Sequence, residues 1–420
     1  MPDPADLTAT EAARAIAAGT LAPAALREAC LARIAAREPA VRAMAYLAPD
    51  GVRATKPAAG PLHGLPIGVK DVLDTADMPS EYNSAIWRGH RPRADAACVA
   101  WAKAAGAVVM GKTVTTEFAT RTPGPTTNPH GPTRTPGGSS SGSAAGVAAG
   151  FFPLAFGTQT AGSIIRPAAY CGVVGYKPSY GLIDRMGMKV MSAGLDTVGV
   201  MARSVADCAL LAGAVSGEDL GDPGAHPGRA PRVGLCRSPV WGRALPETVA
   251  LFDGLRARME RAGAAVTGLA LPPDYDTLED AHAVVMNAES ARALGWEMTT
   301  ARGQLSPALR ERMEWGLSQP AARLAEARAL LHRLQDGFDD VTKGLDIVLT
   351  PAAPGQAPVG LEWTGDAGFN FIWTSLHVPC VTVPAGTGPD GMPLGVQVVG
   401  RRGEDRAALA WAAWVASALG

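Results

Sequence analysis

Two short runs rich in glycine and serine constrain this chain more than any other feature. They are Pro136-Gly137-Gly138-Ser139-Ser140-Ser141-Gly142-Ser143 and Gly157-Thr158-Gln159-Thr160-Ala161-Gly162-Ser163. Glycine allows backbone segments to approach closely and to adopt positive φ. A serine hydroxyl becomes a nucleophile when a neighbouring base removes its proton. The two runs therefore predict an acyl-transfer site that is built from loops with exposed backbone N–H groups.

The composition argues against several other classes of protein. The chain has 420 residues, of which 47% are apolar, and its net charge is −1. This charge gives no basic surface for nucleic acid or an anionic membrane, and no apolar run approaches the roughly 20 residues that span a bilayer. The N-terminal sequence lacks the basic and apolar segments of a secretory signal. The cysteines and histidines are scattered without disulfide or metal-ligand spacing, so we expect a cytoplasmic protein with reduced thiols.

Short apolar runs alternate with helical patterns along the chain. A capping box, Thr8-Ala9-Thr10-Glu11, opens the first predicted helix, and a second helix begins at Pro23. Strands are expected at 67–72, 107–110, 151–156, 172–176, 233–236, 266–269, 346–350, 381–384 and 394–399. Further helices are expected at 95–105, 143–149, 204–211, 246–262, 277–302, 306–341 and 404–419. This alternation predicts an α/β fold with a mixed, mostly buried sheet.

We expect one domain over residues 1–420. It begins with a helical segment at 1–60, continues with a core at 61–215 that carries the candidate catalytic residues, and ends with the remaining α/β core at 232–420. The helix-rich region at 277–341 is expected to cover one edge of the core and to wall the substrate cleft.

One interpretation of the first run is a nucleophile elbow. Gly138-Ser139-Ser140-Ser141-Gly142 matches the pattern Gly-x-Ser-x-Gly, with Ser140 as the nucleophile. An acid and then a histidine must follow, and Asp346 and His377 could serve. Short glycine and serine strings match this pattern by chance, however, so a plain loop is the alternative.

A lysine offers a different base. The run Gly64-Leu65-Pro66-Ile67-Gly68-Val69-Lys70-Asp71 places Lys70 at the end of an apolar strand. A lysine in this position is ordinarily a surface residue, but its neighbours Ile67, Val69 and Val72 indicate burial. Burial lowers the pKa of a lysine and makes the neutral amine available as a base. Serine with a lysine base is a known alternative to the histidine triad.

These residues together resemble the amidase signature family. The resemblance lies in Gly-Val-Lys-Asp at Lys70, in Pro-Gly-Gly-Ser-Ser-Ser-Gly-Ser-Ala-Ala from Pro136, and in Gly-Thr-Gln-Thr-Ala-Gly-Ser-Ile-Ile-Arg-Pro from Gly157. It extends over nearly the whole chain, and its details look most similar to malonamidase-type enzymes. It implies an amidase-signature fold, in which helices cover both faces of a central mixed sheet.

The resemblance also implies a role for each of three residues. Ser163 matches the family nucleophile, Ser139 matches a bridging serine that follows a cis peptide bond, and Lys70 matches the terminal base. The implied reaction is cleavage of the C–N bond of a small amide through an acyl-enzyme, without a metal or organic cofactor. Backbone N–H groups would form the oxyanion hole, from Thr160, Ala161, Gly162 and Ser163.

This chain departs from the commoner family pattern at two positions. Gln159 stands where an aspartate is usual, so any carboxylate that tunes Lys70 must lie elsewhere, with Asp71 as the candidate. Arg166 follows the nucleophile by three positions rather than two. It is either a structural arginine or, as in malonamidase-type relatives, a clamp for a substrate carboxylate.

Several supporting residues complete the expected site. Thr158 and Ser141 are expected to support the proton relay, and the substrate is expected to meet Gly138, Ser140, Thr158, Gln159 and Arg166. Four aromatic residues could line the cleft, although core packing is expected for each: Tyr82, Trp87, Trp363 and Trp373.

Three alternatives stay open. The same triad could act on carbamates, aryl amides or esters. The chain could be an amidotransferase A-type subunit that makes ammonia for a partner, although Gln159 and the position of Arg166 argue against this class. The third alternative is the histidine-dependent hydrolase with Ser140. The expected partner is a small-molecule amide, and the resemblance implies a homodimer.

Overall fold

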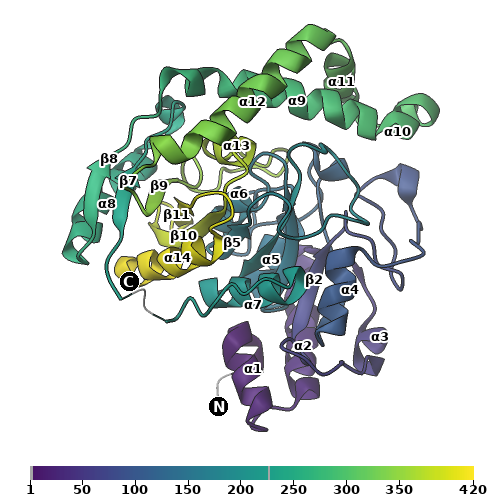
Figure 1. The fold of residues 1–420 in the computed structure, drawn as a ribbon. Helices are drawn as coiled ribbons and strands as arrows, with labels where there is room; N and C mark the ends of the chain where they lie inside the picture. The colour runs from purple at the N-terminus through teal and green to yellow at the C-terminus, as the bar shows by residue number, and fades with distance from the viewer. Residues whose placement is uncertain (1–2, 226–227) are drawn as a thin grey trace.

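The strands form one mixed sheet of eleven strands in the computed structural model, which describes residues 3–225 and 228–420 (Figure 1). Met1 and Pro2, part of the N-terminal sequence considered above, lie outside the described residues. The strands follow the order β1-β3-β2-β4-β6-β5-β10-β11-β9-β7-β8. Their bounds are Met44–Leu47 (β1), Pro66–Lys70 (β2), Val108–Thr113 (β3), Leu154–Gln159 (β4), Val174–Lys177 (β5), Thr197–Ala202 (β6), Arg232–Leu235 (β7), Ala265–Gly268 (β8), Ile347–Pro351 (β9), Cys380–Thr387 (β10) and Pro393–Val399 (β11).

The sheet combines two parallel groups with an antiparallel centre. Strand β2 runs parallel to β3 and β4, and β7 runs parallel to β8 and β9. The strands from β4 through β6, β5, β10 and β11 to β9 are antiparallel to their neighbours. Every residue of β2, β4 and β6 is buried. Their sequences therefore lack the alternation of apolar and polar residues that marks a half-exposed strand.

Helices cover both faces of the sheet. In β5, the missing side chain of Gly175 leaves room for Ala168 of α6, whereas the hydroxyl of the next residue, Tyr176, donates to Asp405 of α14 at 2.6 Å. Successive side chains of a strand point to opposite faces, so α6 and α14 lie on opposite sides. Helix α5 contacts α6, and α7 contacts α14. The bounds are Ser141–Ala149 (α5), Ile165–Cys171 (α6), Val205–Ser216 (α7) and Asp405–Leu419 (α14).

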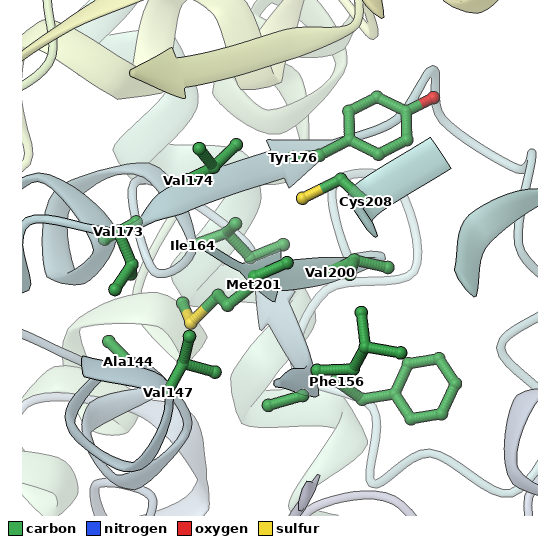
Figure 2. Close-up of a cluster of buried hydrophobic side chains, with 14 of the residues drawn as sticks. Ala144, Val147, Phe156, Ile164, Val173, Val174, Tyr176, Val200, Met201 and Cys208 are labelled. Atoms are coloured by element: carbon green, nitrogen blue, oxygen red, sulfur yellow. The ribbon is translucent and has the colours of Figure 1, made fainter. Parts of the chain in front are cut away.

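The core holds the second glycine run in place. Ile164, which follows Ser163, is fully buried, and Figure 2 shows it among side chains of the sheet and of α5 and α7. A Cβ at Gly199 would lie 2.7 Å from Cδ1 of Ile164, and one at Gly157 would lie 3.0 Å from Oγ of Ser140. Glycine in the central strands therefore lets both catalytic loops approach the sheet.

The remaining helices lie at the ends and edges of the molecule. Their bounds are Ala9–Ala17 (α1), Pro23–Val41 (α2), Pro49–Ala54 (α3), Ala97–Ala104 (α4), Pro246–Arg261 (α8), Leu278–Ala293 (α9), Gly295–Thr300 (α10), Pro307–Leu317 (α11), Ala321–Val341 (α12) and Gly368–Ser375 (α13). Helices α9 to α12 form a separate layer beyond one end of the sheet (Figure 1). Within that layer α9 contacts α11 and α12, and it reaches the core through α13.

The structure corrects some of the expected elements. Strands β1 and β6 were not expected, and β6 occupies the middle of the sheet. Its sequence, Thr197-Val198-Gly199-Val200-Met201-Ala202, carries a central glycine that weakens the strand pattern. The helix expected at 306–341 is two helices: the first ends at Leu317, and Pro320 is the N-cap residue of the second. A proline inside a continuous helix would remove a backbone hydrogen bond. The capping box at Thr8 is confirmed.

Two further findings concern the helices and the cysteines. None of the helices in the described residues is long and apolar enough to cross a membrane. The cysteines are free and buried: Cys30, Cys98, Cys171, Cys208, Cys236 and Cys380.

Candidate active site

Lys70 ends strand β2 and is completely buried. Its Nζ lies 2.7 Å from Oγ of Ser139 and 2.7 Å from Oγ1 of Thr158. A third contact, at 3.3 Å, is with the carbonyl oxygen of Thr158. Burial lowers the pKa of Lys70 well below its ordinary value. The site therefore favours the neutral amine, the form that can accept a proton.

The carboxylate that acts on Lys70 is Asp196, and the expectation that Asp71 would do so is wrong. Asp71 forms an ion pair with Lys112 at 3.1 Å. Asp196 is buried just before β6, and its charge opposes the burial effect by raising the pKa of Lys70. It accepts hydrogen bonds from the Thr160 hydroxyl at 2.6 Å and from two backbone N–H groups. Asp196 thus links the second glycine run to the segment before β6.

The first run enters helix α5 through a cis peptide bond between Gly138 and Ser139. Ser140 is buried. Its hydroxyl donates to the carbonyl oxygen of Thr158 at 3.2 Å and accepts from the N–H of Thr158 at 3.2 Å. The hydroxyl of Ser141 donates to the carbonyl of Val114 at 3.1 Å. Ser139 is thus the residue of the triple serine that faces Lys70, while Ser140 and Ser141 fasten the loop.

The carbonyl groups at the end of the second run are all hydrogen-bonded to the protein. All four carbonyl groups of residues 160–163 accept hydrogen bonds from the protein, the donors being His282 (2.9 Å), Thr374 (2.6 Å), the N–H of Arg166 (3.0 Å) and the N–H of Ser140 (3.4 Å). In the described part of the chain, the N–H groups of Ala161, Gly162 and Ser163 have no acceptor. An oxyanion hole requires such unpaired donors, because they remain available for the oxygen of a substrate.

Gln159 holds the helix that follows the run. Its Oε1 accepts hydrogen bonds from the N–H groups of Ile164 and Ile165 at 2.8 and 3.1 Å, and its Nε2 donates to the Thr374 hydroxyl at 2.9 Å. These are contacts with the protein itself, and the residue is buried. The expected contact between Gln159 and the substrate stays a prediction.

A pocket of about 280 Å³ opens over Ser163. Its wall comes from the second run, from the loop at 119–121, from helices α9 and α11, and from the segment 363–371. The charged and polar lining residues are Thr120, Arg121, Thr160, Ser163, Arg166, Glu279, His282, Arg312, Thr364 and Asp366. A larger cavity of about 680 Å³ lies beyond the ends of β7 and β8, and none of the expected site residues lines it. The smaller pocket is the one that expected site residues line, among them Thr160, Ser163 and Arg166.

Arg166 lines this pocket, and among the residues that the structure describes it has no carboxylate within ion-pair distance. It is buried, and its Nη2 donates to the carbonyl of Gly138 at 2.6 Å and to the hydroxyl of Thr364 at 3.3 Å. Burial lowers its pKa, while the charge of Asp366 acts in the opposite direction. One edge of the guanidinium therefore fixes the peptide group that precedes Ser139.

The nucleophile elbow is not assembled. Asp346 pairs with Arg229 at 2.7 Å and with Arg232 at 2.9 Å. His377 bonds to the carbonyl of Gly194 at 2.8 Å. Neither residue contacts Ser140, because the Ser140 hydroxyl is hydrogen-bonded to the backbone of Thr158 in β4. The histidine-dependent alternative is therefore wrong.

Sequence reasoning missed the outer residues of the site. His282 and Thr374 bind the carbonyls of the second run from α9 and α13, and they lie 122 and 213 residues away from their partners. Nothing in their local sequence indicates this function. Burial lowers the pKa of His282 to about 4, so the ring is neutral and its Nε2 donates to the Thr160 carbonyl. Trp363 was expected in the core but is exposed and lines the pocket, whereas Trp373 is buried as expected.

Comparison with known proteins agrees with this fold. A family model described as Amidase matches residues 25–409, and the chain belongs to this family. Its sequence is 34% identical to that of the A-type subunit of glutamyl-tRNA(Gln) amidotransferase from Chloroflexus aurantiacus, over 94% of this chain and 93% of that relative.

Solved structures of amidases also resemble this chain over nearly their whole length. A structure described as an amidase has a TM-score of 0.90 and 30% identity, and the match covers 99% of this chain and 100% of that one. The native peptide amidase from Stenotrophomonas maltophilia has a TM-score of 0.81 and 29% identity, with 97% and 96% covered. The expected family and the amidase-signature α/β fold are confirmed. The malonamidase-type subgroup receives no such support, since the curated relative belongs to an amidotransferase.

Proposed function

We propose that this protein hydrolyses the C–N bond of a small amide through Lys70, Ser139 and Ser163. The observation that carries the proposal is the buried amine of Lys70 at 2.7 Å from the Ser139 hydroxyl. Ser163 lines the pocket, and its carbonyl accepts from the N–H of Ser140, so the two runs meet at this point. These positions support a relay from the Lys70 amine through the Ser139 hydroxyl to Ser163 at the pocket.

The reaction proceeds by proton relay. Neutral Lys70 accepts the proton of Ser139 as Ser139 accepts that of Ser163, and the Ser163 oxygen attacks the amide carbonyl carbon. The protonated relay then returns a proton to the departing nitrogen, the C–N bond breaks, and ammonia or an amine leaves an acyl ester on Ser163. Water attacks this ester with the same relay as base, which frees the carboxylic acid and restores Ser163.

Two further features support this chemistry. The free N–H groups of residues 161–163 would bind the oxygen of the tetrahedral intermediate, and one such donor contributes roughly 3–4 kcal/mol in comparable enzymes. Thr158 supports the base, because its hydroxyl lies 2.7 Å from Nζ of Lys70. Both features are rigid, since the loops are held by buried hydrogen bonds.

The acyl-enzyme route accepts more than one leaving group. Carbamates, aryl amides and esters remain candidate substrates for the same triad, and a malonamate-like acid amide is the candidate that a substrate clamp at Arg166 would favour. The pocket of about 280 Å³ suits a small acyl group.

The relatives favour a second candidate, an amidotransferase A-type subunit that releases ammonia for a partner. Such a protein must bind a zwitterionic amino-acid amide, which needs a carboxylate as well as a cation. Glu279 and Asp366 line the pocket, although both lie against Arg243, at 3.0 and 3.5 Å.

Alanine variants test the proposal. Ammonia release from simple amides is expected to fall at least about 1,000-fold in Lys70→Ala and Ser163→Ala and strongly in Ser139→Ala, since the relay acts as a unit. His377→Ala is the matched control and is expected to keep its activity. Loss of activity in His377→Ala together with full activity in Lys70→Ala would disprove the triad.

Substrate comparison separates the two candidates. An independent hydrolase is expected to cleave amides without an α-amino group, and a homodimer or monomer is expected in size-exclusion chromatography. A strong preference for glutamine over glutaramate, together with co-purifying partner proteins, would favour the amidotransferase class instead.

A further inference from the structure

Each free N–H group of the second run belongs to a peptide unit whose carbonyl is held by another group of the protein. The peptide units between residues 160 and 163 are trans. A trans peptide unit is planar, and its C=O and N–H bonds point in opposite directions. A donor on the carbonyl of Thr160 therefore also fixes the direction of the N–H of Ala161. The N–H groups of Gly162 and Ser163 are fixed in the same way by the donors on the preceding carbonyls.

The three donors that hold these carbonyls come from different parts of the chain. One is the backbone N–H of Arg166, a single helical turn beyond its acceptor. The second is the hydroxyl of Thr374 on α13. The third is Nε2 of His282 on α9, which lies 2.9 Å from the carbonyl oxygen of Thr160. His282 is the donor that comes from the helical layer, and it also lines the pocket.

His282 is suited to donate a hydrogen bond to this carbonyl. It is buried, and burial lowers its pKa to about 4, so the ring is neutral at ordinary pH. A carbonyl oxygen can only accept, so the proton of the neutral ring lies on Nε2. The ring lies beside that of Phe371, with 5.7 Å between the two centroids, which helps to hold its orientation.

Thr160 is held from its side chain as well. Its hydroxyl donates to Asp196 at 2.6 Å, and Asp196 in turn accepts from two backbone N–H groups. Two separate parts of the fold thus fix the side chain and the carbonyl of one residue, which restricts rotation of the peptide unit between Thr160 and Ala161. A hydrogen bond to a carbonyl in a buried site also polarises its peptide unit, which strengthens the N–H at the other end as a donor.

We propose that His282 is a positioning residue of the oxyanion hole, and that it orients and polarises the peptide unit whose N–H, at Ala161, binds the oxygen of the tetrahedral intermediate. The inference rests on the proposed function, because acyl transfer to Ser163 is the step that forms this oxygen anion. It gives the helical layer a part in the chemistry, through α9, in addition to enclosing the pocket. Nε2 of His282 is not available to the substrate, because the Thr160 carbonyl occupies it.

Turnover of variants tests this position. His282→Leu removes the donor and is expected to lower kcat for butyramide roughly ten- to 100-fold with KM changed less than about two-fold, because the oxygen anion exists only after the substrate has bound. His282→Gln should recover most of this loss, since its amide can donate to the carbonyl but cannot act as an acid or a base. His332→Leu, at an exposed position of α12, is the matched control and should keep its activity. A loss that appears mainly in KM, or a glutamine variant as impaired as the leucine variant, would overturn the inference.

A trifluoromethyl ketone measures the oxyanion hole without turnover. The probe carries the same propyl group as butyramide. Oγ of Ser163 bonds to its carbonyl carbon, the C=O electron pair moves onto the oxygen, and the serine proton passes through Ser139 to Lys70. The inhibition constant is expected to rise in His282→Leu by roughly the same factor as kcat/KM falls. Butyramide should bind Ser163→Ala equally well with and without His282→Leu, as measured by calorimetry.

The ketone also separates this inference from the proposed function. Equal ketone affinity in the wild-type protein and His282→Leu would overturn the inference and leave the triad intact. If the wild-type protein binds the ketone but cleaves no amide, the proposed function fails, and the comparison of ketone affinities still decides the inference. A wild-type protein that neither cleaves amides nor binds the ketone would overturn both.

Discussion

At the scale of single residues, the state of Lys70 decides whether the site can work. A buried amine whose neighbours are two hydroxyls and one carbonyl has little to stabilise a positive charge. Asp196 is the carboxylate that favours the charge, and burial outweighs it. The same burial that makes lysine unfavourable for stability therefore makes it useful as a base.

The pH dependence of activity and of stability should follow from this residue. We expect kcat/KM to fall on the acid side as Lys70 is protonated, and a flat profile between about pH 5 and 9 would contradict a lysine base. The unfolded chain binds a proton at Lys70 below its ordinary pKa of 10.5, whereas the folded chain binds it only below the lowered value. Between these two values the free energy of unfolding therefore rises with pH.

Lys70→Met tests whether Lys70 causes this pH dependence. Methionine fills a similar volume without a titrating group, so the variant should lose activity and also lose this part of the pH dependence of unfolding. The measurement is urea unfolding at several pH values above the acid limb. An identical pH slope in both proteins would show that Lys70 does not change its protonation on folding.

At the scale of elements, Gln159 connects three parts of the site. It ends β4, satisfies two N–H groups at the start of α6, and reaches Thr374 on α13. The same Thr374 hydroxyl donates to the carbonyl of Ala161. The residue that departs from the family pattern thus keeps the second run and its neighbouring helices in register.

Replacing Gln159 should therefore affect turnover more than binding. Gln159→Ala is expected to destabilise the fold by about 1–3 kcal/mol, because it leaves buried donors unpaired, and to lower kcat with a small change in KM. Gln159→Glu keeps the acceptor for α6 but loses the donor to Thr374, so an intermediate effect is expected. A variant that changes only KM would support the direct substrate contact that the sequence predicts.

The elements also show what sequence can and cannot predict. Lys70, Ser139 and Ser163 can be proposed from sequence because each stands in a distinctive local run. Asp196 and His282 were missed because their contacts with the site cross the fold. Strand β6 was missed because a fully buried strand with a central glycine lacks the alternation that marks a half-exposed one.

At the scale of the whole molecule, the pocket over Ser163 has two sources. The loop after β4 forms part of its lining, and the helical layer of α9 to α12 contributes residues of α9 and α11. Several contacts fasten this layer to the rest of the molecule. Glu297 of α10 is buried and accepts hydrogen bonds from Nζ of Lys189 at 2.5 Å and from Nε1 of Trp87 at 2.9 Å. The hydroxyls of Ser306 and Thr122 lie 2.8 Å apart. These contacts help to hold α10 and the start of α11 against the core.

Weakening the contacts of Glu297 with Lys189 and Trp87 should change substrate binding at the active site. Glu297→Gln leaves Lys189 without its carboxylate and is expected to increase hydrogen exchange over residues 294–305 and to raise KM several-fold. Glu311→Gln on the exposed surface of α11 is the control. Faster exchange without any change in KM would show that the layer does not determine substrate binding.

The central claim is that Ser163 carries the acyl group and that Lys70, rather than a histidine, activates it. The most direct measurement is intact-mass and peptide-mapping spectrometry after acid quench of a reaction with a slowly deacylating p-nitrophenyl ester. We predict one acyl adduct on the peptide that contains Ser163, present in wild type and in His377→Ala and absent in Lys70→Ala and Ser163→Ala. An adduct on Ser140, or an adduct that disappears with His377→Ala and persists in Lys70→Ala, would contradict the account.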